Sequence, residues 1–203
     1  FDGNASDVSG NGNDGTVNGA TLVEDRFGVA GKAYSFDGVN DYIQTPVNSN
    51  SLPLSFSVWF ELESITGERS IIDSDRGGHY GHSLILGYGN GDGDLDVQFH
   101  NGSIDTGFVP IPNKWQHVVV NYKDVIQFFH NGQLIVQQAY NATVFDGELF
   151  RLGRHNAGDP QWFHGSIDEV RIYDRALSAD NVQALYQLEK PNDPPTDVHL
   201  SGA

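Results

Sequence analysis

The fold of this chain is decided by one stretch, Gly165-Ser166-Ile167-Asp168-Glu169-Val170-Arg171-Ile172-Tyr173-Asp174-Arg175-Ala176-Leu177-Ser178. Apolar and polar residues alternate along it, so that Ile167, Val170 and Ile172 can point to a buried sheet face, with a slip near Asp168 and Glu169. The alternation breaks at Asp174, and Ser178 is suited to cap a following helix. The stretch therefore predicts a strand that is followed closely by a helix.

The rest of the chain, up to Lys190, reads as strands separated by Gly-Asn and Gly-Asp turns. The pair Asn131-Gly132 predicts a two-residue hairpin, because both central residues need positive φ. The expected strands are Ala33–Phe36, Tyr42–Thr45, Ser55–Leu62, Arg69–Ile72, Ser83–Tyr88, Leu95–His100, Trp115–Tyr122, Val125–His130, Gln133–Ala139, Leu149–Leu152 and Ser166–Tyr173. One helix is expected from Ser178 to about Leu188, packed against the end of the sandwich. The sequence thus predicts an all-β fold of two packed antiparallel sheets with one short C-terminal helix.

The composition is strongly acidic, with a formal net charge of −16 over 203 residues. Such a field repels phosphates and anionic membranes, so nucleic acid and membrane insertion are not expected. It attracts divalent cations, although general solubility explains any one carboxylate equally well. The chain has no cysteine, which excludes disulfides, thiolate metal sites and a cysteine nucleophile. No apolar run is long enough to span a bilayer.

The chain divides into two regimes. Residues 1–190 have the length and apolar content of one large all-β domain. Residues 191–203 are rich in proline and predict an extended linker. This tail also resembles the opening strand of cadherin-like or immunoglobulin-like repeats in large bacterial surface proteins. Together with the start at Phe1 and the lack of Met, it predicts a domain cut from a tandem array.

Five separated segments resemble, in the right order, the laminin-G-like family of concanavalin A-like jelly-roll domains. They are Asp7–Thr16, Tyr34–Ile43, Phe56–Phe60, Trp115–Val118 and Gly165–Ser178. The resemblance spans nearly all of the first regime and implies a jelly-roll sandwich that serves as an extracellular recognition module. It is far less specific for the ligand, because this sandwich hosts lectins, hydrolases, protein-binding modules and inert spacers.

A calcium site is expected at the turn Asp37-Gly38-Val39-Asn40-Asp41, which concentrates oxygen atoms for a cation that takes six to eight ligands. The resemblance implies a structural calcium between this turn, the last strand and the N-terminus. The metal ligands that it implies are Asp2, Asp37, Asn40, Asp41 and Asp168. The alternative is that Asp37 and Asn40 stabilise the turn without a metal, as Asx residues do.

Long polar loops predict a ligand-binding rim, because sandwiches carry function where a loop is richer than a hairpin needs. The candidate ligand-binding residues are Asp75, Arg76, His79, Tyr80, Asn156, Asp159 and Trp162. Trp162 and Tyr80 can stack on the C–H face of a sugar, whereas Trp59 and Trp115 lie in apolar strands and are expected in the core. The alternative for Trp162 is that it caps the sandwich edge beside Phe163.

A second calcium in the rim would need a loop geometry other than the EF-hand. Asn90, Asp92 and Asp94 alternate correctly, but Leu95 replaces the required Gly and Asn101 the closing Glu.

Enzyme signatures are weak, so the chain is predicted not to be an enzyme. Glucanases of related fold carry two carboxylates on one strand that flank the glycosidic bond. Glu61 and Glu63 come closest to this pattern, but the next acid, Glu68, is out of register. Asp92, Asp94 and Asp96 share a strand face without aromatic residues around them. His117 is expected to be a satisfied structural histidine.

These observations predict a non-catalytic, extracellular or cell-surface module of a larger bacterial adhesin, stabilised by calcium. Its expected partners are a glycan or cell-surface polymer and neighbouring repeats of the same chain. Two alternatives stay open: a structural spacer or protein-interaction domain of the same adhesin, and a divergent glycoside hydrolase.

Overall fold

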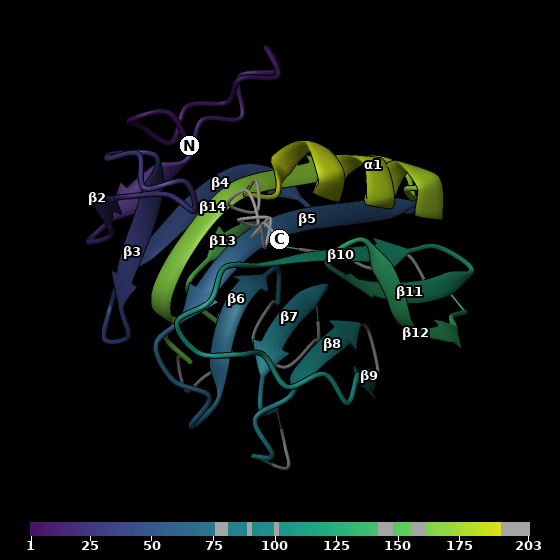
Figure 1. Cartoon of the computed structure of the whole chain (residues 1–203). Helices are drawn as coiled ribbons and strands as arrows, with labels where there is room; N and C mark the ends of the chain where they lie inside the picture. The colour runs from purple at the N-terminus through teal and green to yellow at the C-terminus, as the bar shows by residue number, and fades with distance from the viewer. Residues whose placement is uncertain (76–80, 89–90, 100–101, 142–147, 156–160, 192–203) are drawn as a thin grey trace, which may run out of the picture.

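The computed structural model describes residues 1–75, 81–88, 91–99, 102–141, 148–155 and 161–191. Within these ranges, two antiparallel sheets of seven strands each pack face to face, and one helix covers part of the second sheet (Figure 1). The first sheet has the order β1(Thr16–Asn18), β4(Tyr42–Asn48), β13(Leu149–Leu152), β6(Arg69–Asp73), β7(Ser83–Leu86), β8(Leu95–Phe99) and β9(Gly102–Asp105). The second has the order β12(Gln133–Ala139), β11(Val125–His130), β10(Gln116–Tyr122), β5(Leu54–Leu62), β14(His164–Tyr173), β3(Ala33–Asp37) and β2(Thr21–Val23).

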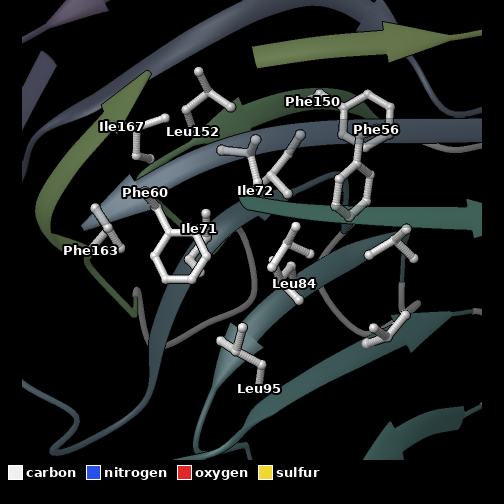
Figure 2. Packing of buried hydrophobic residues seen from close by; sticks show 14 of the residues in the cluster. Phe56, Phe60, Ile71, Ile72, Leu84, Leu95, Phe150, Leu152, Phe163 and Ile167 are labelled. Carbon is white, nitrogen blue, oxygen red and sulfur yellow. The ribbon is translucent and has the colours of Figure 1, made fainter. Parts of the chain in front are cut away.

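The hydrophobic core lies between the sheets (Figure 2). Phe56 and Phe60 point inward from β5, because alternate residues of a strand share a face. They meet side chains from the opposite sheet, and the rings of Phe56 and Phe150 are 6.3 Å apart in an edge-to-face arrangement. Burying each such side chain contributes roughly 1.5–3 kcal/mol, so this layer dominates the stability of the fold.

The slip expected in the last strand is a β-bulge in β14. Asp168 pairs with Trp59 and Arg171 pairs with Ser57, so one extra residue is accommodated between them. Glu169 takes the left-handed conformation there, with φ of 47°. The extra residue has a direct consequence for packing. Ile167 and Ile172 are an odd number of positions apart, yet both contact the core.

The helix α1(Ala179–Glu189) begins where the sequence predicts. The Ser178 side chain accepts a hydrogen bond from the Asn181 amide at 3.2 Å and caps the first turn. Its position differs from the prediction, because α1 lies on the outer face of the second sheet rather than at the end of the sandwich (Figure 1). Val119 and Phe129 are apolar on that outer face, and Val182 of the helix covers them.

Each expected strand is present, with ends within three residues of those predicted. The hairpin at Asn131-Gly132 is confirmed, with φ of 47° and 81° at the two residues. The short strands β1, β2 and β9 are not predicted by alternation, since three or four residues carry too little periodicity. Within the described ranges, no helix has the length and apolar character that crossing a membrane requires. Residues 192–203, which form most of the predicted linker, lie outside the described residues.

Candidate functional site

A buried cluster of polar side chains lies where β6 ends. Asp73 is the last residue of β6, and Asp75 follows it. The imidazole of His155 lies against both, with Nε2 3.3 Å from Asp75 Oδ2 and 3.9 Å from Asp73 Oδ1. Ser83, at the start of β7, donates a hydrogen bond to Asp73 Oδ1. All four side chains are almost completely buried at this edge of the first sheet, and we call them the buried floor.

The two carboxylates control the charge of the histidine. Burial acts to lower the pKa of His155, but hydrogen bonding of its imidazole to the Asp75 carboxylate and the charges of both aspartates outweigh it, and the pKa lies above its ordinary value. Burial raises the pKa of Asp73, against the opposing effects of His155 and Ser83. The cluster therefore favours an imidazolium between two acids.

Close backbone packing keeps this floor compact. A Cβ atom at Gly81 would lie 2.3 Å from the carbonyl group of Ser74, so only glycine fits there. The Ser74 hydroxyl accepts a hydrogen bond from the His82 amide at 2.9 Å and donates one to the His82 carbonyl. These contacts hold Ser74, just after β6, against Gly81 and His82, just before β7.

An aromatic cluster contacts Arg154, the residue before His155. The guanidinium of Arg154 is 5.1 Å from the ring centre of Trp162 and 5.2 Å from that of Tyr42, and the two rings are 6.4 Å apart. Arg154 and Trp162 also pair through an isolated β-bridge. Trp162 is partly exposed, whereas Phe163 is fully buried against Phe36. A cation–π stack on Arg154, rather than packing beside Phe163, therefore holds the Trp162 ring.

The two clusters are neighbours along the chain, because Arg154 and His155 are consecutive residues, and we call Tyr42, Arg154 and Trp162 the Trp162 rim. Of the predicted ligand-binding residues, Asp75 belongs to the buried floor and Trp162 to the aromatic cluster. The others, Arg76, His79, Tyr80, Asn156 and Asp159, lie outside the described residues. Sequence reasoning singled out neither Tyr42 nor Arg154. Tyr42 begins a strand and Arg154 lies two residues after the end of another, and such positions carry no motif.

The predicted metal ligands do not converge on one point. Asp37 pairs with His164, four residues before Asp168, which places it about 13 Å away along an extended strand. Asp2 is exposed and forms an ion pair with Lys32.

Within the turn, Asp37 Oδ1 accepts hydrogen bonds from the amides of Val39 and Asn40, and Asp41 Oδ2 accepts one from the Asp37 amide. These are the contacts expected of Asx residues that stabilise a turn. A calcium ion at this turn stays a prediction.

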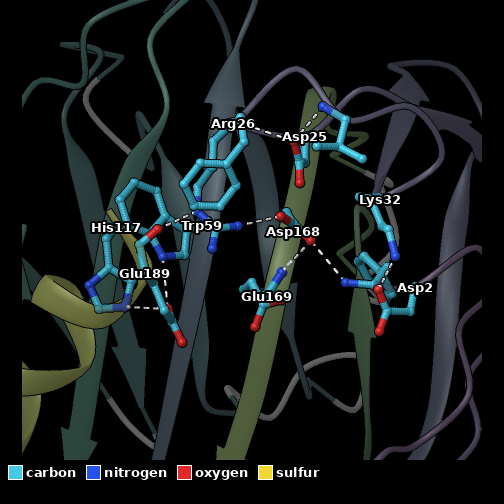
Figure 3. Close-up of polar contacts among 12 residues, drawn as sticks. Asp2, Asp25, Arg26, Lys32, Trp59, His117, Asp168, Glu169 and Glu189 are labelled. Carbon is cyan, nitrogen blue, oxygen red and sulfur yellow. Dashed lines mark hydrogen bonds and ion pairs between the residues drawn. The ribbon is translucent and has the colours of Figure 1, made fainter. Parts of the chain in front are cut away.

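Asp168 does not fit a calcium ligand, because its charge is already compensated (Figure 3). Its Oδ2 lies 2.5 Å from Arg26 Nη1, and its Oδ1 accepts hydrogen bonds from the nitrogen of Phe1 at 2.9 Å and from the Glu169 amide at 2.8 Å. Asp168 is only 1% exposed, so a calcium ion could reach its carboxylate only by displacing the Arg26 guanidinium.

A second buried network lies beneath α1 (Figure 3). Glu189, the last residue of α1, accepts a hydrogen bond from Trp59 Nε1 at 2.9 Å and forms an ion pair with Arg171. His117 is fully buried, with Nε2 2.8 Å from the Ser57 hydroxyl. Trp59 is only 2% exposed, and its ring is stacked on Tyr186 at 5.9 Å. The structural assignment of His117 and the burial of Trp59 are confirmed, although both face α1 rather than the core between the sheets. The expected core position of Trp115 is wrong, because this residue precedes β10 and is only partly buried.

The acids weighed as a catalytic pair also have structural surroundings. Glu61 and Glu63 are two residues apart on β5 and its end, where partial burial and the Glu63 charge raise the pKa of Glu61. Glu63 Oε2 is 3.0 Å from His164 Nε2. The described residues around them include no stacked aromatic rings that would bind a sugar, which distinguishes this edge from the Trp162 rim.

Residues 37–183 match a laminin G-like family that is described as the concanavalin A-like lectin/glucanases superfamily. No curated protein matches the chain significantly in sequence. Domain 4 of AbnA, a GH43 extracellular arabinanase from Geobacillus stearothermophilus solved in complex with arabinotriose, is 25% identical. It superposes with a TM-score of 0.74, covering 91% of this chain and 93% of that domain.

Two further solved structures share the fold at lower identity. The binding domain of botulinum neurotoxin serotype D is 17% identical, with a TM-score of 0.70 over 91% of this chain and 49% of that one. A putative carbohydrate-binding protein from Bacteroides ovatus is 19% identical, with a TM-score of 0.60 over 75% and 46%. The present chain therefore matches about half of each of these proteins.

Proposed function

The chain belongs to the concanavalin A-like lectin/glucanases superfamily, and from this premise we propose that it is a carbohydrate-binding module without catalytic activity. The observation that carries the proposal is the rim formed by Tyr42, Arg154 and Trp162 beside the buried cluster of Asp75 and His155. A partly exposed ring held flat by an arginine offers an apolar face to sugar C–H groups. Polar groups nearby can then fix the orientation of sugar hydroxyls.

The nature of the expected ligand follows from charge and from the arabinanase domain. The net charge of −16 disfavours acidic polysaccharides, so the ligand is expected to be neutral. Domain 4 of the arabinanase, which covers nearly the whole of this chain, was solved with the neutral oligosaccharide arabinotriose. Arabinotriose is therefore the first probe, followed by a panel of neutral plant and microbial glycans.

The proposal extends to the setting of the domain, an extracellular module of a larger surface protein. Domain 4 is itself part of an extracellular enzyme, and the tail of this chain resembles the start of a surface repeat. The flanking sequence tests this point. Neighbouring adhesin repeats would support it, whereas an adjacent catalytic domain would make the module an appendage of an enzyme.

Isothermal titration of arabinotriose and the glycan panel tests binding at the rim. Trp162→Ala should weaken the binding of whichever glycan binds by at least about tenfold, as loss of a central aromatic contact does. The matched control is Phe27→Ala, since Phe27 is also an exposed aromatic held by an arginine, Arg26, at 4.4 Å. Equal affinity in Trp162→Ala and the unmodified chain would remove the rim from the proposal.

The same panel separates the other two functions. Failure to bind any glycan would favour a spacer or protein-interaction domain. Release of reducing sugar that is abolished by Glu61→Gln or Glu63→Gln would establish a hydrolase and contradict the proposal.

A further inference from the structure

Three carboxylates converge at the edge of the first sheet, at its β8–β9 hairpin. Asp92 and Asp94 come from the connection between β7 and β8, and Asp105 is the last residue of β9. One oxygen of each lies within 4.8 Å of an oxygen of both others. Asp92 and Asp105 are exposed, whereas Asp94 is 2% exposed. The cluster thus has one buried carboxylate and two that face the solvent.

Asp94 is unusual because half of its carboxylate is buried without a partner. Its Oδ2 accepts a hydrogen bond from the Gly107 amide at 3.0 Å. Its Oδ1 is buried and, within the described part of the chain, receives no hydrogen bond. A buried carboxylate oxygen without a donor is costly, and it is normally paired or bound to a metal.

The described basic side chains do not balance the charge of Asp94 or Asp105. No described lysine or arginine forms an ion pair with Asp94 or Asp105. A fourth acid, Asp96, stands directly across the hairpin from Asp105 and is 3% exposed. The cluster therefore concentrates carboxylates that a cation would compensate.

Backbone contacts hold the cluster in place before any ligand arrives. The Gly107 amide donates to both Asp94 Oδ2 and Asp105 Oδ1, at 3.0 and 2.8 Å. The Asp94 carbonyl accepts a hydrogen bond from the Gly87 amide at 2.7 Å. The Thr106 hydroxyl donates to the Leu95 carbonyl at 2.5 Å, which fixes the end of β9 against β8. A preformed site loses little conformational freedom on binding.

We propose that Asp92, Asp94 and Asp105 bind a calcium ion. Three carboxylates supply up to six hard oxygen ligands, and the two exposed side chains leave room for water. The cluster has neither the imidazoles nor the thiolates that favour zinc. The EF-hand spacing fails here because the third ligand comes from the far end of the following hairpin rather than from the same loop. The ion would join the β7–β8 connection to the edge strand β9.

Calcium titration of the chelator-treated chain tests the site, by calorimetry and by the melting temperature. We expect one equivalent of calcium to bind, with a dissociation constant at or below about 1 mM, as in extracellular modules, and the melting temperature to rise with calcium concentration. Asp105→Asn should weaken this binding by about tenfold or more, because affinity follows the number of charged ligands. Asp105 is exposed, so the variant is expected to fold.

Two controls make the result specific. Asp124→Asn removes an exposed acid from the turn between β10 and β11 and should bind calcium like the unmodified chain. Asp37→Asn should leave this equivalent intact, which separates the cluster from a site at the Asp37 turn. Absence of calcium binding in the unmodified chain, or unchanged binding in both Asp105→Asn and Asp94→Asn, would overturn the proposal. Neither result bears on glycan binding at the Trp162 rim.

Discussion

At the scale of single residues, Asp168 shows how a buried charge is stabilised in this domain. Arg26 pairs with it, donates a hydrogen bond from Nε to the Glu189 carbonyl at 2.6 Å, and lies 5.0 Å from the ring centre of Trp59. The guanidinium thus connects the N-terminal segment, the strand β14 and the end of α1. Arginine suits this position because its planar group can bond and stack at once.

Replacing Arg26 by methionine should destabilise the domain by about 3–5 kcal/mol, because the Asp168 carboxylate would be left buried without its charged partner. Asp168→Asn in the same background should restore much of that loss, since the uncompensated charge is then gone. Chemical unfolding of both single variants and the double variant measures the coupling between the residues. Additive losses would show that the ion pair contributes little.

His130 carries a pH effect of defined sign. Burial lowers its pKa to about 4, and its ring lies 4.0 Å from that of Phe108. Because the folded value lies below the ordinary value of about 6.5, protons bind the unfolded chain more tightly. The contribution of neutral His130 is complete above pH 6.5 and is lost as the pH falls toward 4.

Between pH 7.5 and pH 5, this residue alone should cost about 1–2 kcal/mol of stability, a figure reduced for its partial exposure. His130→Gln should remove that part of the pH dependence, and urea unfolding at the two pH values measures it. His164→Gln, at a more exposed histidine, is the matched control. An identical fall in stability for the His130→Gln variant and the unmodified chain would contradict the assignment.

Residues differ in how far the sequence reveals them. His117 and Trp59 were predictable as structural because both lie in apolar, alternating strands. Asp168 was visible as an acid in an otherwise regular strand, but its partner Arg26 lies 142 positions away in an irregular segment. No local pattern reveals such a pairing, so the calcium interpretation was the natural one from sequence.

At the scale of the elements, β14 packs closely against β5 because the residue near its start is a glycine. Gly165 has φ of 150°, and a Cβ atom there would lie 2.1 Å from the Glu61 carbonyl oxygen of β5. The two strands therefore approach one another at a distance that excludes any side chain. The bulge at Glu169 follows four residues later and turns Asp168 toward Trp59.

Gly165→Ala should destabilise the domain by more than about 3 kcal/mol, since it combines backbone strain with a steric clash. Gly10→Ala is the control for strain alone, because Gly10 has φ of 84° and no heavy atom within 4 Å of the added Cβ. Its cost should be about 1–2 kcal/mol. Equal losses in the two variants, measured by chemical unfolding, would show that the approach of β14 to β5 is not limiting.

The elements were predictable where their periodicity is long. Long strands such as β5 and β10 alternate over seven or more residues, and α1 has a capping serine and an apolar stripe. The helix was misplaced because alternation shows which residues face outward but not which partner covers them. Val119 and Phe129 look like ordinary core positions until the sheet order is known.

At the scale of the whole molecule, the fold was predictable and the site only in outline. Five ordered segments were enough for the sandwich, whereas the ligand-binding rim stays a prediction, because five of its seven predicted residues lie outside the described part of the chain. The pairing of Arg151 with Asp73 joins β13 to β6, and no sequence pattern states which strands are neighbours. The contribution of Tyr42 and Arg154 follows from that pairing and could not be foreseen.

The charge of the whole chain also explains its acidic edge. There are 27 acidic and 11 basic residues, and Arg26, Arg154 and Arg171 are engaged in internal contacts. Few cations are left for carboxylates at the periphery such as Asp94. In a chain of this composition, a dissolved cation is the natural partner for a converging group of acids.

Two of the three tryptophans, Trp59 and Trp162, differ in exposure and can serve as optical reporters, whereas Trp115 is half-buried. Trp59 is buried beneath α1, so its fluorescence changes when the domain unfolds and is protected from quenchers dissolved in the solvent. Trp162 reaches the solvent while its indole rests against Arg154, so its emission responds to whatever covers the rim. In a chain that carries Trp115→Phe, differential quenching of the two remaining tryptophans therefore distinguishes occupancy of the rim from loss of the fold, without any added label.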